Sequence, residues 1–335
     1  MTNAIMKKST INDVAKLAKV SRGTVSNFIN GKPIRKENRE RIAEAIRQLN
    51  YVPNVMAREL KTSKSSTVVF IVPTNWTPFF SELVYHMQVE LDQNGYKMIL
   101  ANSHADPTKE EEILQMASLH QVTGLITMSY SDVYNFIHFG NQLNIVSIER
   151  FISDDVPLIT SDNYGGGVLA AQKLIDKGAK KFLLLRRKVN HQNATDQRTQ
   201  GFMDTIHEQR FPVDIFEASL NENYQSEIIE YFKTHYEYGL AFDGIFAVTD
   251  EYAQIAKSTI NSFNPDYKDK VNIIGFDGAR DSQFAPYRVD SIRQPVEQIV
   301  KEAVSVIKRL IDGEEVEKGY KKIFDVSFVE AGNDG

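Results

Sequence analysis

Residues 21–30 read Ser-Arg-Gly-Thr-Val-Ser-Asn-Phe-Ile-Asn and combine hydrogen-bonding side chains with apolar residues at helical spacing, Val25 and Ile29. On a helix Val25 and Ile29 face inward, and the polar side chains stay outside. Hydroxyl groups such as those of Thr24 and Ser26 suit phosphate oxygens, whereas arginine and asparagine reach base edges in the major groove of DNA. The stretch therefore predicts a surface that binds nucleic acid; a small helical bundle with a polar face is the alternative.

Short helices on either side would position that surface. Thr10 precedes the first, with Asp13 three residues later in an approximate capping box, and Ser21 is placed to cap the second. A third apolar-periodic segment spans residues 36–49. Three short helices with a tight turn between the first two predict a helix-turn-helix, whose second helix enters the major groove by its amino terminus.

The charge of the chain is divided unevenly. Residues 1–65 hold 14 Lys and Arg against 5 Asp and Glu, a net charge of +9, whereas the remaining residues have a net charge of −14. A basic head on an acidic body is typical of a nucleic-acid-binding module joined to another domain. A solvated basic tail is the alternative. The length of 335 residues suits two or three domains.

Composition excludes several other classes of protein. Without cysteine the chain has no disulfide, no thiolate metal site and no cysteine nucleophile. No apolar run approaches the roughly 18 residues of a membrane span, and no apolar signal segment follows the start. We therefore expect a cytoplasmic protein. The sequence also lacks the phosphate-binding loop, the dinucleotide-binding glycine turn, the His-Glu-x-x-His helix and the Gly-x-Ser-x-Gly elbow, so we expect no enzyme, no cofactor and no metal.

Residues 52–66 follow the three helices and differ from them. Pro53 and Asn54 offer a start for a short helix near residues 54–60, which is too weak to persist alone. Leu60 has no evident core to join, and minor-groove binders insert such apolar side chains between base steps. The segment is therefore predicted to be a hinge helix that forms on DNA, followed by a linker rich in Ser, Thr and Lys.

From residue 67 onward, apolar runs alternate with segments long enough for helices. "TVVFIVPTN" is a candidate buried strand, a helix is expected over 79–94, and further strand candidates are "YKMILANS", "GLITMS", "NIVSIER", "KKFLLLRR", "GIFAVTD" and "NIIGFDG". Such alternation predicts doubly wound parallel sheets, with ligands at the carboxyl ends of the strands. The units are too many for one sheet, so two lobes are expected.

Polar and aromatic residues follow several of these strands. Aspartate, asparagine and arginine suit the hydroxyls of a sugar, and aromatic faces suit its ring. The candidate residues are Phe79, Phe80, Glu149, Thr249, Asp250 and Asp277. Thr249 and Asp250 have the alternative of capping the next helix, and Phe79 and Phe80 cannot both face a cleft from one helix.

A group of cations also follows a strand. Arg186, Arg187, Lys188 and later His191 would suit a phosphate, which favours a phosphorylated sugar as ligand. The alternative is that these side chains are solvated or pair with neighbouring acids. Trp76 either lines the mouth of the cleft or covers the lobe.

The sequence resembles the LacI/GalR family of bacterial transcription regulators. "TINDVAKLAKVSRGTVSNFING" and "LNYVPNVMARELKT" are similar to its helix-turn-helix and hinge helix, and "SDNYGGGVLAAQKLIDKGAKKFLLL" and "SIRQP" extend the resemblance through the body. The resemblance implies an N-terminal all-α helix-turn-helix head and an α/β two-lobed, periplasmic-binding-protein-like core. The implied domains are 1–51 for the head, 52–66 for the hinge helix and linker, 67–161 plus 292–321 for the N-lobe, and 162–291 plus 322–335 for the C-lobe. Three crossovers, near Asp162, Ser291 and Lys322, would join the lobes around an effector cleft.

The resemblance also assigns roles to individual positions. Arg22, Gly23 and Asn27 would select bases, Leu60 would enter the minor groove, and Arg198 in "RTQGF" would grip the effector beside Asp277 and Glu149. Four residues depart from the family pattern: Gly23 has no side chain with which to read a base, Asn27 replaces Arg, Arg35 replaces a Ser or Thr cap, and Glu149 replaces Asp. The complete predicted DNA-binding set is Thr10, Ser21, Arg22, Gly23, Thr24, Ser26, Asn27, Asn30, Asn54, Ala57, Arg58 and Leu60. The complete predicted effector-binding set is Phe79, Phe80, Glu149, Arg186, Arg198, Thr249, Asp250 and Asp277.

The resemblance and the residues together predict a homodimeric repressor of carbohydrate-utilisation genes. It would bind a pseudo-palindromic operator and be released by a sugar or sugar phosphate, with sucrose or its phosphate one candidate. One alternative is a catabolite-control-type regulator whose DNA binding is enhanced by a phosphorylated phosphocarrier protein. The other is a sugar-binding receptor, or an enzyme on the same lobes, without a role on DNA.

Overall fold

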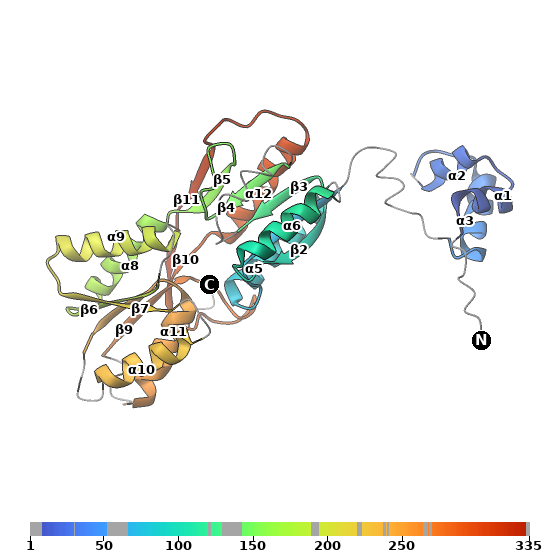
Figure 1. The fold of residues 1–335 in the computed structure, drawn as a ribbon. Helices are drawn as coiled ribbons and strands as arrows, with labels where there is room; N and C mark the ends of the chain where they lie inside the picture. The colour runs from blue at the N-terminus through green and yellow to red at the C-terminus, as the bar shows by residue number, and fades with distance from the viewer. Residues whose placement is uncertain are drawn as a thin grey trace. The chain divides into compact units, whose positions relative to one another are not determined.

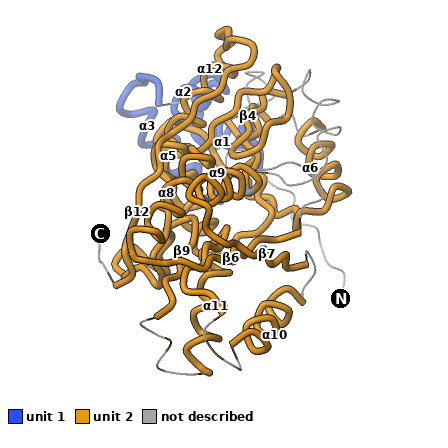
Figure 2. The backbone as a smooth tube through the Cα atoms, turned by 90° about the vertical axis from the view of Figure 1, so that its left-hand side faces the viewer, with its two compact units in different colours: residues 1–65 blue, residues 66–335 orange. Residues whose placement is uncertain are grey.

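The computed structural model describes residues 9–29, 31–51, 66–119, 122–128, 143–188, 194–219, 223–236, 239, 241–263, 267 and 270–332. It separates into two compact units, residues 1–65 and 66–335 (Figure 2). The predicted hinge helix lies outside the described residues, as do the predicted contacts Asn30, Asn54, Ala57, Arg58, Leu60 and His191. None of the described helices combines the length and the apolar character that a membrane crossing requires.

The first unit contains three helices, α1 (Ile11–Leu17), α2 (Arg22–Ile29) and α3 (Lys36–Gln48). The side chains of Val14, Val25 and Ile42, one from each helix, are fully buried against one another. This core is small because only one face of each short helix is apolar. The helix-turn-helix is therefore present as predicted.

Local capping sets where these helices begin. Thr10 and Asp13 form the capping box, in which the Thr10 N–H donates to Asp13 Oδ2 at 2.9 Å. The Thr24 N–H donates to Ser21 Oγ at 3.1 Å, so Ser21 caps α2 as expected. Arg35 precedes α3 without a side-chain cap. Lys19 occupies the turn between α1 and α2 at φ +52°, a left-handed conformation that glycine adopts at lower cost.

The N-lobe of the second unit is built on a parallel sheet with the strand order β11-β5-β4-β3-β1-β2. Its strands are β1 (Thr67–Val72), β2 (Lys97–Asn102), β3 (Gly124–Thr127), β4 (Ile145–Ile148), β5 (Leu158–Ser161) and β11 (Lys321–Phe324). Its helices are α5 (Pro78–Gln93), α6 (Pro107–Leu119) and α12 (Val296–Ile311). Alternate residues of β1 face opposite sides of the sheet: Phe70 packs with residues of α5 and α12, whereas Ile71 packs with α6.

The C-lobe repeats this plan with the strand order β12-β10-β9-β8-β6-β7, in which only β12 is antiparallel to its neighbour among the described strands. Its strands are β6 (Phe182–Arg187), β7 (Val213–Ala218), β8 (Gly244–Ala247), β9 (Asn272–Asp277), β10 (Asp290–Arg293) and β12 (Ser327–Val329). Its helices are α8 (Asn163–Asp176), α9 (Ala194–Glu208), α10 (Tyr224–Tyr236) and α11 (Asp250–Phe263). Helices α8 and α9 lie on one side of the sheet, and α10 and α11 lie on the other (Figure 1). The fold class is therefore the predicted one.

Two of the three chain crossings between the lobes lie a few residues later than predicted. Ile292 and Arg293 still pair with β9 in the C-lobe sheet, so the second crossing follows Arg293. Lys322 and Phe324 pair with β5 in the N-lobe sheet, so the third crossing follows Phe324 rather than lying near Lys322. Strand pairing sets these boundaries, and it is not visible in the local sequence.

Two glycines allow α8 and α9 to pack closely. A Cβ on Gly201 would lie 2.1 Å from Tyr164 O, and one on Gly167 would lie 2.1 Å from Arg198 O. We expect Gly201→Ala to lower the free energy of unfolding of the core by about 2–3 kcal/mol, because backbone atoms of two packed helices must separate. Urea titration followed by circular dichroism measures this change. Gly23→Ala is the control, since its new Cβ would meet nothing closer than Ser21 Oγ at 3.6 Å; an equal loss there would contradict the explanation.

Candidate effector site and DNA-reading helix

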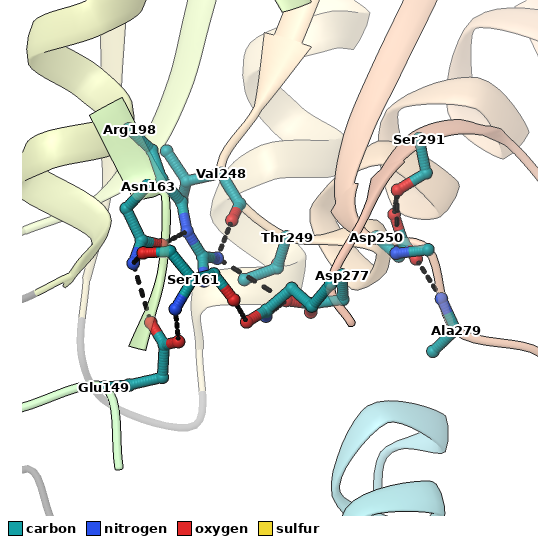
Figure 3. Close-up of polar contacts among 12 residues, drawn as sticks. Glu149, Ser161, Asn163, Arg198, Val248, Thr249, Asp250, Asp277, Ala279 and Ser291 are labelled. Carbon is teal, nitrogen blue, oxygen red and sulfur yellow. Dashed lines mark hydrogen bonds and ion pairs between the residues drawn. The ribbon is translucent and has the colours of Figure 1, made fainter. Parts of the chain in front are cut away.

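Arg198 of α9 is buried where the carboxyl ends of β8 and β9 meet (Figure 3). Its exposure is 4%, and its guanidinium carbon lies 3.7 Å from the centroid of the Phe276 ring. Nε donates to Asn163 Oδ1 at 2.7 Å and Nη1 donates to Val248 O at 2.9 Å. Nη2 donates to no residue that the structure describes. The side chain is thus held rigidly, with a charged donor left over for a ligand.

Asp277 supplies an acceptor beside that donor. Its Oδ1 lies 3.5 Å from Arg198 Nη1 and accepts from Gln294 Nε2 at 2.8 Å. Its backbone has φ +118°, which is unusual for a residue other than glycine and marks a conformation held by its surroundings. Arg198 and Asp277 therefore lie together as predicted, and they offer the donor and acceptor that sugar hydroxyls require.

Burial raises the pKa of Asp277 from an ordinary value of 3.8 to about 6, although the Arg198 cation opposes the shift. The folded protein thus binds this proton more tightly than the unfolded chain does. Between pH 4 and 6, roughly, the contribution of Asp277 to the free energy of unfolding therefore falls as pH rises. We expect this fall to be smaller in Asp277→Asn, as measured by urea titration at several pH values. Parallel pH profiles for the two proteins would contradict the raised pKa.

Glu149 is used inside the protein rather than presented to the cleft. One carboxylate oxygen accepts from the Ser161 N–H at 2.6 Å, and the other accepts from Asn163 Nδ2 at 2.7 Å. The residue is buried and has φ +62°. Glu149 follows β4 of the N-lobe, whereas Asn163 begins α8 of the C-lobe, so this pair joins the lobes at the first crossing. In this structure Glu149 orients Asn163, which in turn orients Arg198.

Thr249 caps the next helix, which was the alternative to ligand binding, whereas Asp250 bonds to residues from other parts of the C-lobe. The Asp250 carboxylate accepts from the Ser291 hydroxyl and from the Ala279 N–H, the latter at 3.0 Å. Burial, and next the nearby charge of Asp277, raise the pKa of Asp250 well above its ordinary value. Thr249 Oγ1 accepts from the Tyr252 N–H at 3.4 Å at the start of α11. Both residues therefore fix the strand ends that surround the site.

The predicted aromatic contacts separate into core and surface. Phe79 is 6% exposed and packs in the N-lobe core, so its predicted contact with the effector is not supported. Phe80, partly buried, lies edge-on to it with ring centroids 5.3 Å apart. Trp76, in the loop that follows β1, is 91% exposed. Of these side chains, Trp76 is the most accessible from solvent.

Arg186, the first of the predicted phosphate-binding cations, is less available than expected. The guanidinium of Arg186 pairs with Glu217 of the neighbouring strand β7. A paired arginine offers less attraction to a phosphate, because its charge is already balanced. Pairing with a neighbouring acid was the alternative to phosphate binding for the "LLLRRKVNH" segment, and Arg186 follows it.

Two side chains of this site were not predicted as site residues. Gln294 bonds to Asp277, and its Oε1 accepts from Ser161 Oγ at 2.8 Å, which joins the first and second crossings. Asn163 links Glu149 to Arg198. Asn163 lies in the family segment that begins "SDNYGGG", and Gln294 lies in "SIRQP". Their place in these segments was the only feature of the sequence that could have indicated a role at the site.

In the first unit, α2 presents an exposed polar surface. Ser21, Arg22, Gly23 and Asn27 are exposed, while Thr24 and Ser26 are partly buried. The hydroxyls of Ser21 and Thr24 lie 2.8 Å apart and share a hydrogen bond. Among the described residues, and apart from its chain neighbours and its own helix backbone, only this Ser21 hydroxyl lies within 4 Å of where a side chain at Gly23 would begin. The amino-terminal turn of α2 is therefore accessible to a DNA groove, as a helix-turn-helix requires.

A helix-turn-helix head and a two-lobed core with a polar site between parallel-strand ends together define a ligand-responsive DNA-binding regulator. Residues 10–54 match the family model of bacterial regulatory proteins of the lacI family, and residues 65–311 match that of periplasmic binding proteins and the sugar-binding domain of the LacI family. The chain belongs to the LacI family of bacterial transcription regulators.

Named relatives cover almost the whole chain. The sucrose operon repressor of Pediococcus pentosaceus is 31% identical over 91% of this chain and 93% of its own length. The ribose operon repressor of Halalkalibacterium halodurans is 30% identical over 86% of each. Among solved structures, the lac repressor dimer bound to operator and an anti-inducer covers 97% of this chain and 98% of its own, with a TM-score of 0.81 and 20% identity, which shows the fold. The protein is thus a DNA-binding repressor of the sugar-responsive type.

Proposed function

We propose that this protein represses carbohydrate-utilisation genes from a pseudo-palindromic operator and that a sugar bound between the lobes releases it. The observation that carries the proposal is the unused Nη2 donor of buried Arg198 beside the Asp277 carboxylate. A rigid donor next to an acceptor matches two neighbouring hydroxyls of one sugar ring. The names of the relatives, sucrose and ribose operon repressors, support the same class of ligand.

A neutral sugar is favoured over a sugar phosphate. Of the cations at the end of β6 that would bind a phosphate, Arg186 is already paired with Glu217. The carboxylate of Asp277 lies at the site itself and would repel a second anion. Sucrose is the first sugar to test, because three relatives carry the name sucrose operon repressor.

A homodimer follows from the two-fold symmetry of such an operator. The N-lobe offers a surface for it. Tyr85 and Val89 are separated by one turn of α5 and are exposed despite their apolar side chains, with Tyr85 at 63% exposure. Exposed apolar side chains one turn apart on a helix favour burial against a second copy.

The test is fluorescence anisotropy of labelled upstream DNA with the purified protein, repeated with neutral sugars and their phosphate esters. Release by a neutral sugar, with its ester weaker, is the expected result. Trp76 is the only tryptophan of the chain, so its emission gives a second readout of sugar binding. DNA binding that needs a phosphorylated phosphocarrier protein would instead favour the catabolite-control alternative. No DNA binding at low salt would contradict the role of the basic head.

A further inference from the structure

An ion pair between Arg293 and Glu82 crosses from one lobe to the other. Nη1 of Arg293 donates to Glu82 Oε2 at 2.8 Å, and Nη2 pairs with the other oxygen of the same carboxylate. Only 21% of the Arg293 side chain and 20% of the Glu82 side chain are exposed. A bidentate pair of this kind is among the stronger charge-assisted contacts, and removing one partner leaves a mostly buried charge uncompensated.

The Arg293 side chain is anchored in the C-lobe. Arg293 is the last residue of β10 and is paired with Asp277 of β9. Its backbone lies so close to Gly278 that a Cβ on that glycine would be 2.5 Å from Arg293 Cα. Arg293 Nη1 also donates to Gly278 O at 2.8 Å. Any movement of the end of the C-lobe sheet therefore moves the guanidinium.

Glu82 is anchored in the N-lobe. It lies on α5, where its neighbour Leu83 is buried in the N-lobe core. His86, one turn further along α5, has its Nε2 atom 4.0 Å from Glu82 Oε1 and 4.0 Å from Glu297 Oε1 at the start of α12. Burial alone would lower the pKa of Arg293, but the Glu82 carboxylate outweighs it and the pKa is raised. Arg293 therefore stays charged.

The pair lies between the effector site and the proposed dimer surface. Gln294, the residue after Arg293, donates to Asp277 through both its side chain, at 2.8 Å, and its backbone N–H, at 3.1 Å. A ligand that displaces Asp277 therefore pulls directly on the segment that carries Arg293. On the other side, Glu82 shares α5 with Tyr85 and Val89, the exposed residues of the proposed dimer surface.

We propose that the Arg293–Glu82 ion pair is a latch that couples effector binding to operator binding. The latch stabilises one of the two lobe arrangements between which the effector shifts the protein. Effector and operator favour opposite arrangements in the proposed function, so loss of the latch must change the affinity for operator and the affinity for effector in opposite directions. This inference rests on the proposed function, in which a sugar releases the operator.

The test is Glu82→Gln, which removes the charge and keeps the shape. Operator affinity is measured by fluorescence anisotropy, and sugar affinity is measured by calorimetry in the absence of DNA. We expect the two dissociation constants to move in opposite directions, each by at least about fivefold, the lower end of typical coupling. The double variant Glu82→Arg, Arg293→Glu should return both constants toward those of the wild type.

Lys177→Gln is the matched control, because the Lys177–Asp290 pair has similar burial, an N–O distance of 3.2 Å, and both partners in the C-lobe. It should change neither constant. Unchanged constants in Glu82→Gln, or a joint weakening of both, would overturn the latch. If no sugar releases the wild-type protein, the proposed function fails separately. In that case the latch is still supported if Glu82→Gln changes operator affinity and the double variant returns it to the wild-type value. An unchanged operator affinity in Glu82→Gln overturns it.

Discussion

Replacing Arg198 by lysine should abolish release from the operator at sugar concentrations that release the wild-type protein. Lysine keeps the positive charge but cannot bond Asn163, Val248 and a ligand at once from one planar group. It also loses the stacking on Phe276. We expect sugar affinity to fall by at least about 100-fold, since two or more buried hydrogen bonds of about 1.5–3 kcal/mol each are affected. Calorimetry with the sugar identified on the wild type measures the loss.

Operator binding without sugar should survive this change, because the head is a separate unit with its own core. Arg210→Lys is the matched control: Arg210 is exposed just after α9, and its replacement should leave sugar affinity unchanged. A sugar response in Arg198→Lys equal to that of the wild type would show that the effector binds elsewhere.

Arg22→Ala is expected to have the second large effect, on the operator rather than on the effector. Arg22 is exposed in the first turn of α2, where side chains of a helix-turn-helix reach base edges. Neighbouring Gly23 has no side chain that could also contact a base. Loss of a bidentate contact with guanine costs about 1–3 kcal/mol, so operator affinity should fall by about 10- to 100-fold. Anisotropy on operator and on scrambled DNA measures the difference.

The loss should be much smaller on scrambled DNA, because base contacts carry the specificity and phosphate contacts do not. Arg47→Ala controls for charge, since Arg47 is exposed at the end of α3 and pairs with Glu44. Sugar affinity should stay at the wild-type value in both variants. An equal loss on both DNA sequences would make Arg22 a phosphate contact instead of a base contact.

The sequence allowed the head to be predicted in detail because its determinants are local. The Thr10–Asp13 capping box and the Ser21 cap each connect residues three positions apart. The longer apolar runs, such as those of β1 and β6, were equally visible as strands. Five strands were missed: β5, β10, β11 and β12 span only three or four residues each, and β7 is an edge strand that mixes acidic and apolar residues.

The site was harder to predict because its bonds join distant parts of the chain. The resemblance identified Arg198 and Asp277, which the structure places together. It also suggested a ligand contact for Glu149, and the position of Asp250 at a strand end suggested another. The Glu149 carboxylate accepts from Ser161 and Asn163, and the Asp250 carboxylate accepts from Ser291. One partner of Glu149 lies 12 residues away in the sequence and one partner of Asp250 lies 41 residues away. The local sequence does not show whether such a carboxylate faces a ligand or a partner, because the packing of the sheets brings the partners together.

The three crossings between the lobes have a consequence for the order in which the protein becomes functional during synthesis. The last part of the chain supplies α12 and β11 to the N-lobe and β12 to the C-lobe. Neither lobe can therefore complete its folding until this part has left the ribosome. The head needs none of these segments and can fold first, as amino-terminal domains generally do. A translation product that stops before α12 would therefore have a folded DNA-binding head and an incompletely folded core. Such a product would have the DNA-binding surface without the completed effector site that regulates it.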